Sequence, residues 1–240
     1  MSDDKGRKAT VAVPRPGGKP STSTRNDARP GRLSRLADAA AFLRGFLERP
    51  SEVASVVPSS VVLEARVVRR AEVSQARCVV ELGPGTGGTT RALLRALPAD
   101  ARLLAIDVNP GFCDRLRREL DDPRLVVHLG SAESLAEVVL HYGLPTPDAV
   151  VSGIPFSTLP EVLAQKIAAS IHTSLAPGGR MIAYQWRPHV ARYLAPHFGP
   201  AFTTWVWRNV PPMRVFRWTK PRLLCGSQHH QPRRQSTDHQ

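Results

Sequence analysis

The stretch VVELGPGTGGTTRALL, residues 79–94, decides the fold. Its apolar run is followed by three alternating glycines, Gly83, Gly85 and Gly87, and then by a fourth glycine and a helical pattern. Glycine adopts positive φ angles and lets a ligand approach the backbone closely, while the first turn of a helix presents unpaired N–H groups. The stretch therefore predicts a buried strand, a ligand-binding loop and the start of a helix.

Short runs rich in β-branched residues alternate with helical patterns along the rest of the chain. This alternation is typical of a parallel sheet covered by helices on both faces. Because the expected strands are apolar almost throughout, both of their faces should be buried. The expected strands are 78–82, 103–107, 125–129, 149–154 and 180–186, and the intervening helices are 89–97, 111–120, 132–141 and 159–175.

The two ends of this pattern differ from its middle. After residue 198, alternating segments on either side of Pro211 and Pro212 predict an antiparallel pair that closes the sheet edge. Before the first strand, the segment 33–49 and a second segment at about 59–72 predict amphipathic helices. The serines that precede the second helix are suited to cap its exposed N–H groups.

Composition divides the chain into a domain and two tails. Residues 1–32 are rich in Pro, Gly, Ser, Thr and Arg, so disorder is predicted there and in 221–240. One domain, 33–220, is expected between them, with the amphipathic helices at 33–72. Residues 1–32 carry +5 and residues 220–240 carry +3, which leaves +5 of the total +13 for the body. Such a basic chain is attracted to polyanions, either RNA or an anionic bilayer.

The lengths of the apolar runs limit where in the cell the protein can be located, and the number and spacing of the cysteines limit the bonds and metal sites they can form. No run approaches the roughly 18–20 apolar residues of a membrane-spanning helix, and the N-terminus lacks the apolar block of a secretion signal. A cytoplasmic location is therefore expected. The three cysteines, Cys78, Cys113 and Cys225, are odd in number and far apart, which predicts neither a disulfide framework nor a metal site.

Two acidic residues indicate which ligand the glycine loop binds. Glu81 ends the first strand, where a carboxylate attracts a ligand that carries an amine, and Asp107 ends the second, where it can accept hydrogen bonds from both ribose hydroxyls. This pair suits S-adenosylmethionine better than a pyrophosphate. Two alternatives stay open. Gly83, Gly85 and Gly88 also match the pattern G-x-G-x-x-G of dinucleotide-binding proteins, so the ligand could be a nicotinamide cofactor. The loop could also be a simple turn that binds no ligand.

The sequence from 79 to about 219 resembles the class I methyltransferases. Their hallmark is E/D-x-G-x-G-x-G at the first strand, an acidic residue at the end of the second, and a seven-stranded, Rossmann-like α/β sheet that is mostly parallel and has an antiparallel last strand. The resemblance implies S-adenosylmethionine as cofactor, S-adenosylhomocysteine as product and no metal. The implied cofactor-binding residues are Glu81, Gly83, Pro84, Gly85, Thr86, Gly87, Asp107, Val108, Ser131, Ala132 and Glu133.

The loop SGIPF, residues 152–156, follows the fourth expected strand and matches the position of the N-P-P-Y type motif of amino-methyltransferases, including rRNA adenine dimethyltransferases. Backbone carbonyls near Ser152, Gly153 and Ile154 are candidates to accept the N–H groups of an amine. Phe156 is a candidate to stack beside it. The asparagine of the motif is absent, and Ser131 stands where adenine-binding relatives of that family place Asp, which weakens the RNA interpretation.

A narrower resemblance, over about residues 40–219, is to the bacterial phospholipid N-methyltransferases. It depends on FLRGFLERPSEVASVVPSSVVLEARVV (42–68), on the glycine loop, on VVSGIPF (150–156) and on VWRNVPPMRVFRWTK (206–220). It implies methylation of phosphatidylethanolamine, toward phosphatidylcholine, by an enzyme peripherally bound to the inner leaflet of the cytoplasmic membrane. Phe42, Leu43, Phe46 and Leu47, flanked by arginines, have the composition of an interfacial helix, although the same stripe could pack on the sheet.

Recognition of the headgroup requires further side chains. Arg187 and Arg208 are candidates to bind its phosphate, together with Asn209, because they follow strands at the edge where ligands bind in such sheets. Tyr184 is assigned to the catalytic set, since it can orient the amine. The amine must lose a proton before it can attack, and Tyr184 and Glu133 are candidate relays.

Alternatives to this function remain at the level of sequence. They are an rRNA adenine N6-methyltransferase, a methyltransferase for another aminolipid or small amine, and a lipid-binding module without catalysis. Nucleic acid is therefore a less favoured partner than an anionic phospholipid surface. The sequence indicates neither the oligomeric state nor the number of methyl groups transferred.

Overall fold

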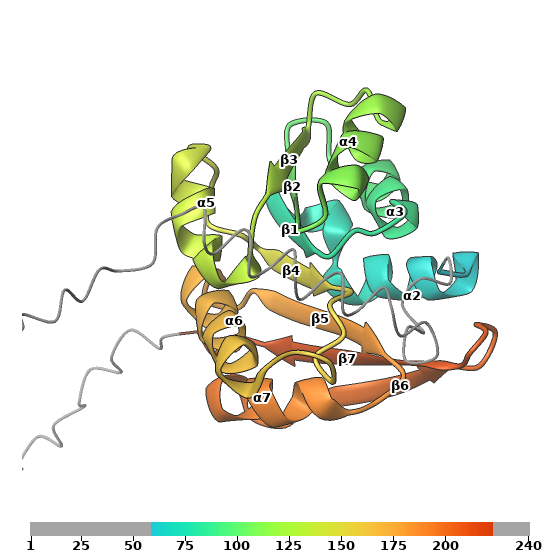
Figure 1. Ribbon diagram of the computed structural model, residues 1–240, viewed down its shortest axis with the longest axis vertical. Helices are drawn as coiled ribbons and strands as arrows, with labels where there is room; N and C mark the ends of the chain where they lie inside the picture. Colours follow the sequence, from blue (N-terminus) through green and yellow to red (C-terminus); the bar gives the residue numbers. More distant parts are fainter. Residues whose placement is uncertain (1–58, 223–240) are drawn as a thin grey trace, which may run out of the picture. The chain divides into compact units, whose positions relative to one another are not determined.

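The computed structural model describes residues 59–222, which form a seven-stranded sheet with helices on both faces (Figure 1). The strand order is β3-β2-β1-β4-β5-β7-β6, in which β1 to β5 are parallel and β7 runs antiparallel to both of its neighbours. This is the predicted Rossmann-like methyltransferase fold. The strands are β1 (Cys78–Leu82), β2 (Arg102–Asp107), β3 (Leu125–Leu129), β4 (Ala149–Ser152), β5 (Arg180–Gln185), β6 (Phe202–Val206) and β7 (Met213–Thr219).

The helices follow the order expected for a doubly wound sheet, and the predicted helices that fall within the described residues are present. The helix 33–49 lies outside those residues. The helical segments are α2 (Val61–Ala71), η2 (Val73–Gln75), α3 (Gly88–Ala96), α4 (Pro110–Glu119), η3 (Ala132–Ser134), α5 (Leu135–His141), α6 (Glu161–Ser174) and α7 (His189–Phe198).

The core has two layers because alternate strand residues point to opposite faces of the sheet. Val79 of β1 packs in a cluster with Leu63 of α2 and Leu93 of α3. Its neighbour Val80 packs in the other cluster, with residues of α5, α6 and α7 such as Ile167. The strands are apolar throughout because both faces are covered, as the sequence predicts.

Helix α7 was not among the predicted helices. Its sequence, HVARYLAPHF, contains Pro196, which removes a backbone donor inside the helix and obscures the pattern. Val190 and Leu194, one turn apart, are fully buried against the sheet. Packing of this pair therefore stabilises a helix that local propensity does not favour.

Short-range hydrogen bonds set where other helices begin. The Ser60 side chain accepts a hydrogen bond from the Leu63 N–H at 3.2 Å and caps α2, as predicted. Asn109 caps α4 in the same way, and Pro110 occupies its first turn. Helix α3 follows Gly87 without a side-chain cap, which leaves its first N–H groups available to a ligand.

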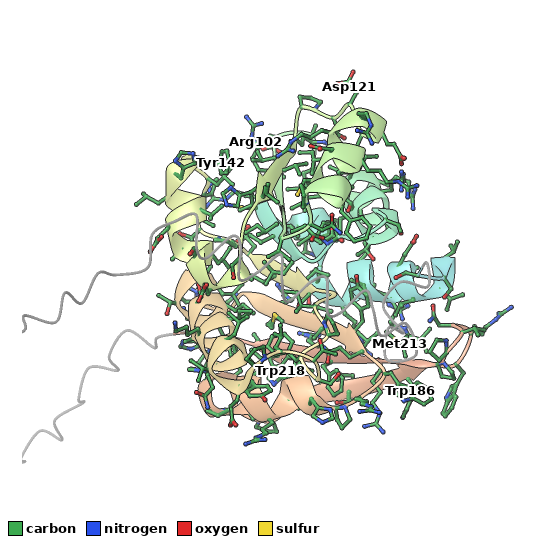
Figure 2. The ribbon with its side chains drawn as sticks, viewed as in Figure 1. Arg102, Asp121, Tyr142, Trp186, Met213 and Trp218 are labelled. Atoms are coloured by element: carbon green, nitrogen blue, oxygen red, sulfur yellow. The ribbon has the colours of Figure 1, made fainter. Side chains whose placement is uncertain are left out.

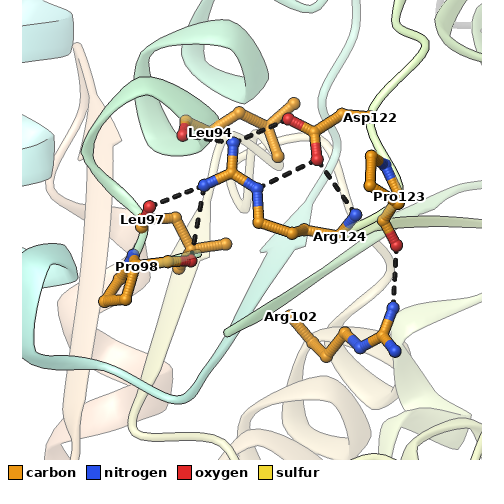
Figure 3. A network of polar contacts seen from close by, with 7 residues as sticks. All are labelled: Leu94, Leu97, Pro98, Arg102, Asp122, Pro123 and Arg124. Carbon is orange, nitrogen blue, oxygen red and sulfur yellow. Dashed lines mark hydrogen bonds and ion pairs between the residues drawn. The ribbon is translucent and has the colours of Figure 1, made fainter. Parts of the chain in front are cut away.

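The amino edge of the sheet, where the parallel strands begin, is held by a network around Arg124 (Figure 3). Its guanidinium donates to the carbonyls of Leu94 and Leu97 at 2.9 and 2.6 Å, and it pairs with Asp122 at 2.7 Å. Arg124 thus binds the last carbonyl groups of α3, where a cation also complements the helix dipole.

None of the helices within residues 59–222 combines the length and the apolar character needed to cross a bilayer.

Candidate active site

The carboxyl edge of the sheet brings the predicted ligand-binding loops together. The strand order reverses between β1 and β4, and ligands of such sheets bind in the crevice at this switch point. Gly83 donates its N–H to the Ile106 carbonyl at 2.9 Å, and Gly153 donates to the Leu82 carbonyl at the same distance. These bonds extend the pairing of β1 with both neighbours and fix the two loops side by side.

The three alternating glycines have two different roles. All have positive φ, at 73° for Gly83, 55° for Gly85 and 81° for Gly87. A Cβ on Gly83 would lie 3.2 Å from Ile154, and one on Gly87 would lie 2.7 Å from Leu116, so these two glycines are required by contacts within the protein. A Cβ on Gly85 would meet no described atom within 4 Å. Gly85 therefore leaves the space that a ligand against the backbone needs.

Asp107, at the end of β2, faces this loop. Its side chain is nearly buried, and it accepts hydrogen bonds from the N–H groups of Gly85 at 3.4 Å and Asn109 at 2.9 Å. Burial raises the pKa of Asp107, while these backbone hydrogen bonds oppose the increase. A carboxylate has about four acceptor positions, so capacity remains for the two hydroxyl groups of a ribose.

Glu81, at the end of β1, is fully buried on the side of the sheet that faces α2 and α3. Within residues 59–222, neither carboxylate oxygen has a hydrogen-bond partner by distance and angle. Burial raises the pKa of Glu81 to about 8; the nearby Thr90 hydroxyl opposes the increase, and Asp107 and Glu64 add to it. A buried acid without a partner is costly to the fold, and its charge favours a cation bound nearby.

A small cavity of about 50 Å³ lies between the glycine loop and the N-terminus of α2. Its lining includes Ser59, Gly85, Gly153, Tyr184 and Asn209, so segments from five parts of the chain meet here. Pro84 and Thr86 also line it. The sequence predicted several of these residues, including Asn209 of the β6–β7 turn, but it did not predict that the start of α2 would help to close the cavity.

Tyr184 is held in place on this cavity by its neighbours. Its hydroxyl lies 3.3 Å from the Thr89 hydroxyl, and a Cβ on Gly153 would lie only 2.6 Å from the Tyr184 oxygen. Burial and the charge of Glu81 raise the pKa of Tyr184, so the phenol stays protonated. Tyr184 is thus suited to orient a ligand through its oxygen rather than to remove a proton.

Sequence comparison identifies the family to which this site belongs. The family model of a methyltransferase domain matches residues 79–179. An ornithine lipid N-methyltransferase from Singulisphaera acidiphila is 30% identical over 183 residues, which cover 75% of this chain and 95% of that protein. The chain belongs to the class I S-adenosylmethionine-dependent methyltransferases.

Other class I methyltransferases match more distantly. A ribosomal RNA small subunit methyltransferase A from Phenylobacterium zucineum is 34% identical over 93 residues, but the match covers 38% of this chain and only 31% of that protein. The solved structure of the N-methyltransferase NodS from Bradyrhizobium japonicum, in complex with S-adenosylhomocysteine, superposes with a TM-score of 0.54 at 16% identity. That superposition covers 66% of this chain and 85% of NodS, and it shows the fold.

The residues of this methyltransferase fit the donor. Gly85 leaves space against the backbone, Asp107 offers acceptors for ribose hydroxyls, and the unpaired carboxylate of Glu81 lies close to the loop. The first N–H groups of α3 carry no side-chain cap and favour the negative charge of a carboxylate. The ribose, the amino group and the carboxylate of an adenosyl amino acid thus each have a complementary group in the protein.

The remaining predicted cofactor residues lie at the ends of β2 and β3. Val108 directly follows Asp107, and Ser131 and Ala132 begin η3, whose first turn Ser131 caps by accepting from the Glu133 N–H at 3.4 Å. The Glu133 carboxylate lies 3.8 Å from Lys166. No group of three or more His, Cys, Asp or Glu side chains within the described part of the chain could hold a metal ion.

A hydrogen bond attaches the loop that follows β4 to the end of β5. Ser152 is buried and its hydroxyl accepts the Ile154 N–H at 3.2 Å. The amide of Gln185 donates to the Ile154 carbonyl. That carbonyl already has a partner, so it is less available to an amine.

Two predicted substrate residues make contacts within the protein. Phe156 is 1% exposed in the core with α6 and α7, so its ring offers no face to a ligand. The Asn209 side chain accepts the Ser60 N–H at 2.9 Å and donates to the Pro211 carbonyl at 2.8 Å. Both ends of its amide are thus used to hold the β6–β7 turn against the start of α2. The burial of Phe156 is a correction to the proposed substrate contacts, whereas Asn209 lines the cavity and its role in substrate binding stays a prediction.

The predicted cationic and membrane residues divide into two groups. Arg187 and Arg208 are exposed and follow β5 and β6 at the carboxyl edge, as predicted. The predicted membrane-contact residues Phe42, Leu43, Phe46 and Leu47 lie outside the described residues.

Proposed function

We propose that this class I methyltransferase transfers methyl groups to the amino group of a membrane aminolipid. The observation that carries the proposal is the 30% identity to an ornithine lipid N-methyltransferase, because that match spans 95% of the relative. Phosphatidylethanolamine is the acceptor implied by the sequence resemblance, and ornithine lipid is the acceptor in the relative's name. Both present an amine next to an anionic group, so one site chemistry suits either.

An RNA acceptor is supported less well. The match to the ribosomal RNA methyltransferase covers only 38% of this chain and 31% of that protein, so it supports an RNA acceptor less than the match over 95% of the lipid enzyme supports a lipid. Ser131 also replaces the Asp that the adenine-binding relatives carry. Ribosomal RNA is therefore included among the acceptors in the test of the proposal.

In this proposal the protein mainly positions the reactants. The bound donor supplies an electrophilic methyl group on a sulfonium. The glycine loop and Asp107 hold the donor, and the loop after β4, with Tyr184, orients the amine toward it. An alkyl amine with a lysine-like pKa is mostly protonated at neutral pH, so the site must accept it after loss of a proton. Because Tyr184 keeps its own proton, it is not the base.

Recognition of the anionic group is assigned to arginines of the carboxyl edge. Arg187 and Arg208 are exposed there, and a guanidinium forms paired hydrogen bonds with a phosphate or carboxylate. In the two candidate lipids this group is the phosphate of phosphatidylethanolamine or the carboxylate of ornithine lipid. The enzyme would act at the inner leaflet of the cytoplasmic membrane.

The test uses purified full-length protein, donor labelled at the transferred methyl group, and four separate acceptors. These are phosphatidylcholine vesicles containing phosphatidylethanolamine, the same vesicles containing ornithine lipid, phosphatidylcholine vesicles alone, and ribosomal RNA. We expect label in the lipid fraction with one or both aminolipids and none with phosphatidylcholine alone. Label found only in RNA, or in no acceptor by a protein that binds S-adenosylhomocysteine, would overturn the proposal.

A further inference from the structure

Three tryptophans gather at the end of the β6–β7 hairpin, next to the end of β5. Trp186 is 45% exposed and Trp207 is 69% exposed, while Val210 in the turn between β6 and β7 is 82% exposed. Trp205 lies between them and is partly buried. Trp186, Trp205, Trp207 and Val210 are called the tryptophan platform below. Figure 1 shows the β6–β7 turn extending beyond the sheet, and Figure 2 shows Trp186 at the same end as Met213.

The platform is an ordered arrangement of rings. Trp205 and Trp207 stack with centroids 5.0 Å apart and planes at 15°, and Trp186 meets Trp205 edge to face at 6.4 Å. The Arg214 guanidinium lies 4.4 Å from the Trp205 ring centroid. These contacts hold the rings against one another. They do not cover Trp207 and Val210, which leave exposed apolar surface next to the partly exposed Trp186.

Positive charge surrounds the platform. Arg187 follows Trp186 directly, Arg208 follows Trp207, and Arg214 contacts Trp205. Residues 180–222 contain seven Arg and one Lys and no acidic residue. Tryptophan with flanking arginine is the composition that favours the interface between a bilayer and water, where the ring lies among the headgroups and the guanidinium meets anionic phosphate.

The platform is continuous with the active site. The same turn that carries Trp207 and Val210 also carries Asn209, and Asn209 and Met213 line the cavity beside the glycine loop. Asn209 is fixed to the start of α2 through the Ser60 N–H. A bilayer in contact with the platform would therefore lie directly beside the opening through which a lipid headgroup reaches the donor.

We propose that the tryptophan platform docks the enzyme on an anionic phospholipid surface, with Trp207 and Val210 inserted among the headgroups. This inference rests on the proposed function, and it adds a contact surface separate from the predicted helix 33–49. It explains why apolar side chains are exposed at the edge of the sheet that carries the catalytic loops.

Single-stranded RNA is the other polyanion that binds surfaces of Arg and Trp. Bases stack on free aromatic faces. Trp205 already stacks on Trp207 and contacts Arg214, so little of its ring surface is available to a base. Insertion into a headgroup layer requires only exposed apolar surface, which Trp207 and Val210 provide. The geometry thus favours a membrane.

The docking test compares two double variants of the full chain. W207S/V210S removes the exposed part of the platform. L140S/V162S removes two apolar side chains of similar exposure, 81% and 65%, on α5 and α6. All four positions are at the surface, so both variants should keep the wild-type melting temperature. Sedimentation uses vesicles of 70% phosphatidylcholine and 30% phosphatidylglycerol, which contain no aminolipid.

We expect W207S/V210S to partition onto these vesicles at least five-fold more weakly than the wild type, while L140S/V162S partitions normally. In wild-type protein, phosphatidylcholine brominated near the headgroup should quench tryptophan fluorescence, and this quenching should fall strongly in W207S/V210S. Of the three tryptophans that remain in this variant, Trp218 is 2% exposed and serves as an internal reference. Equal partitioning of all three proteins, or quenching unchanged in W207S/V210S, would overturn docking through the platform.

Activity separates this inference from the proposed function. With an aminolipid in vesicles, W207S/V210S should methylate at least five-fold more slowly at low lipid concentration, whereas a short-chain, monomeric aminolipid should be methylated at the wild-type rate. If wild-type protein docks on vesicles and methylates no lipid, the proposed function fails and the platform stands. If lipid is methylated and W207S/V210S loses only binding to RNA, the platform is an RNA surface and the docking proposal fails.

Discussion

The two edges of the sheet use polar side chains in opposite ways. At the amino edge they form hydrogen bonds within the protein. Arg124 binds three carbonyls and Asp122, and Lys220 donates to the carbonyls of His172 and Leu175. Asp148 accepts from the N–H groups of Arg77 and Cys78. At the carboxyl edge, Glu81 has no partner within the described residues, and Arg187 and Arg208 are exposed.

The volume of a surface depression does not distinguish the two edges of the sheet. A depression of about 370 Å³ lies near the start of β3 and is larger than the cavity beside Gly85. Two of its charged side chains are already engaged, however, since Asp122 pairs with Arg124 and Arg117 binds Asp114 and the Val127 carbonyl. The buried, unpaired carboxylate of Glu81, rather than volume, therefore indicates where a ligand binds in this molecule.

The difference between the two edges of the sheet is tested most strongly by replacing one glycine near each edge with valine. Gly85 at the carboxyl edge and Gly143 before β4 have φ of 55° and 59°, and a Cβ on either would meet no described atom within 4 Å. Gly85→Val and Gly143→Val should each lower stability by about 1–2 kcal/mol. Only Gly85→Val should weaken binding of S-adenosylhomocysteine, by roughly 100-fold or more, since the valine fills donor space. Calorimetry measures this, and equal affinities in the two variants would contradict the assignment.

The next test concerns the charge of Glu81. Its folded-state pKa of about 8 lies above the ordinary 4.5, so its contribution to stability is full below pH 4.5 and is lost as the pH rises through 8. Glu81→Gln should remove this decline from denaturation curves of the free protein. It should also weaken S-adenosylhomocysteine binding roughly 10- to 100-fold. Affinity in the wild type should rise from pH 6 to 8, and a flat profile would exclude Glu81 as the counter-charge.

The smallest effect on function is expected at the amino edge. Arg124→Ala should lower the free energy of unfolding by about 1–3 kcal/mol because three backbone carbonyls at the end of α3 and Asp122 lose their partner. Arg102→Ala, which loses one exposed hydrogen bond to the Pro123 carbonyl, should cost less than about 1 kcal/mol. Neither variant should change the affinity for S-adenosylhomocysteine. Urea denaturation and calorimetry together check this, and a loss of affinity would break the separation of the two edges.

Much of the fold follows from local sequence patterns. The apolar strands, the glycine loop and the serine cap of α2 are each encoded within a few residues, and their positions are confirmed. The edge at which the loops meet follows as well, because parallel strands place their carboxyl ends together. The acidic residues Glu81 and Asp107 therefore come near the loop as their positions at strand ends predict.

The directions of loop side chains were less predictable. Phe156 and Asn209 both follow strands at the correct edge, yet the first turns into the core and the second binds the start of α2. Outside a strand, side chains no longer alternate, so direction depends on tertiary contacts such as the Ser60 N–H, 149 residues away from Asn209 in sequence. For the same reason the sequence did not show that Trp186 and Trp207 share a surface.

The described chain enters and leaves the fold at different edges. Ser59 lines the cavity, whereas Arg222 lies against Gly178 at the start of β5. A fluorescent label attached just before Ser59 would therefore report on ligands that enter the cavity, and one attached at Arg222 would be insensitive to them. For the same reason, a protein immobilised through the side on which Arg222 lies would keep the cavity beside the glycine loop accessible.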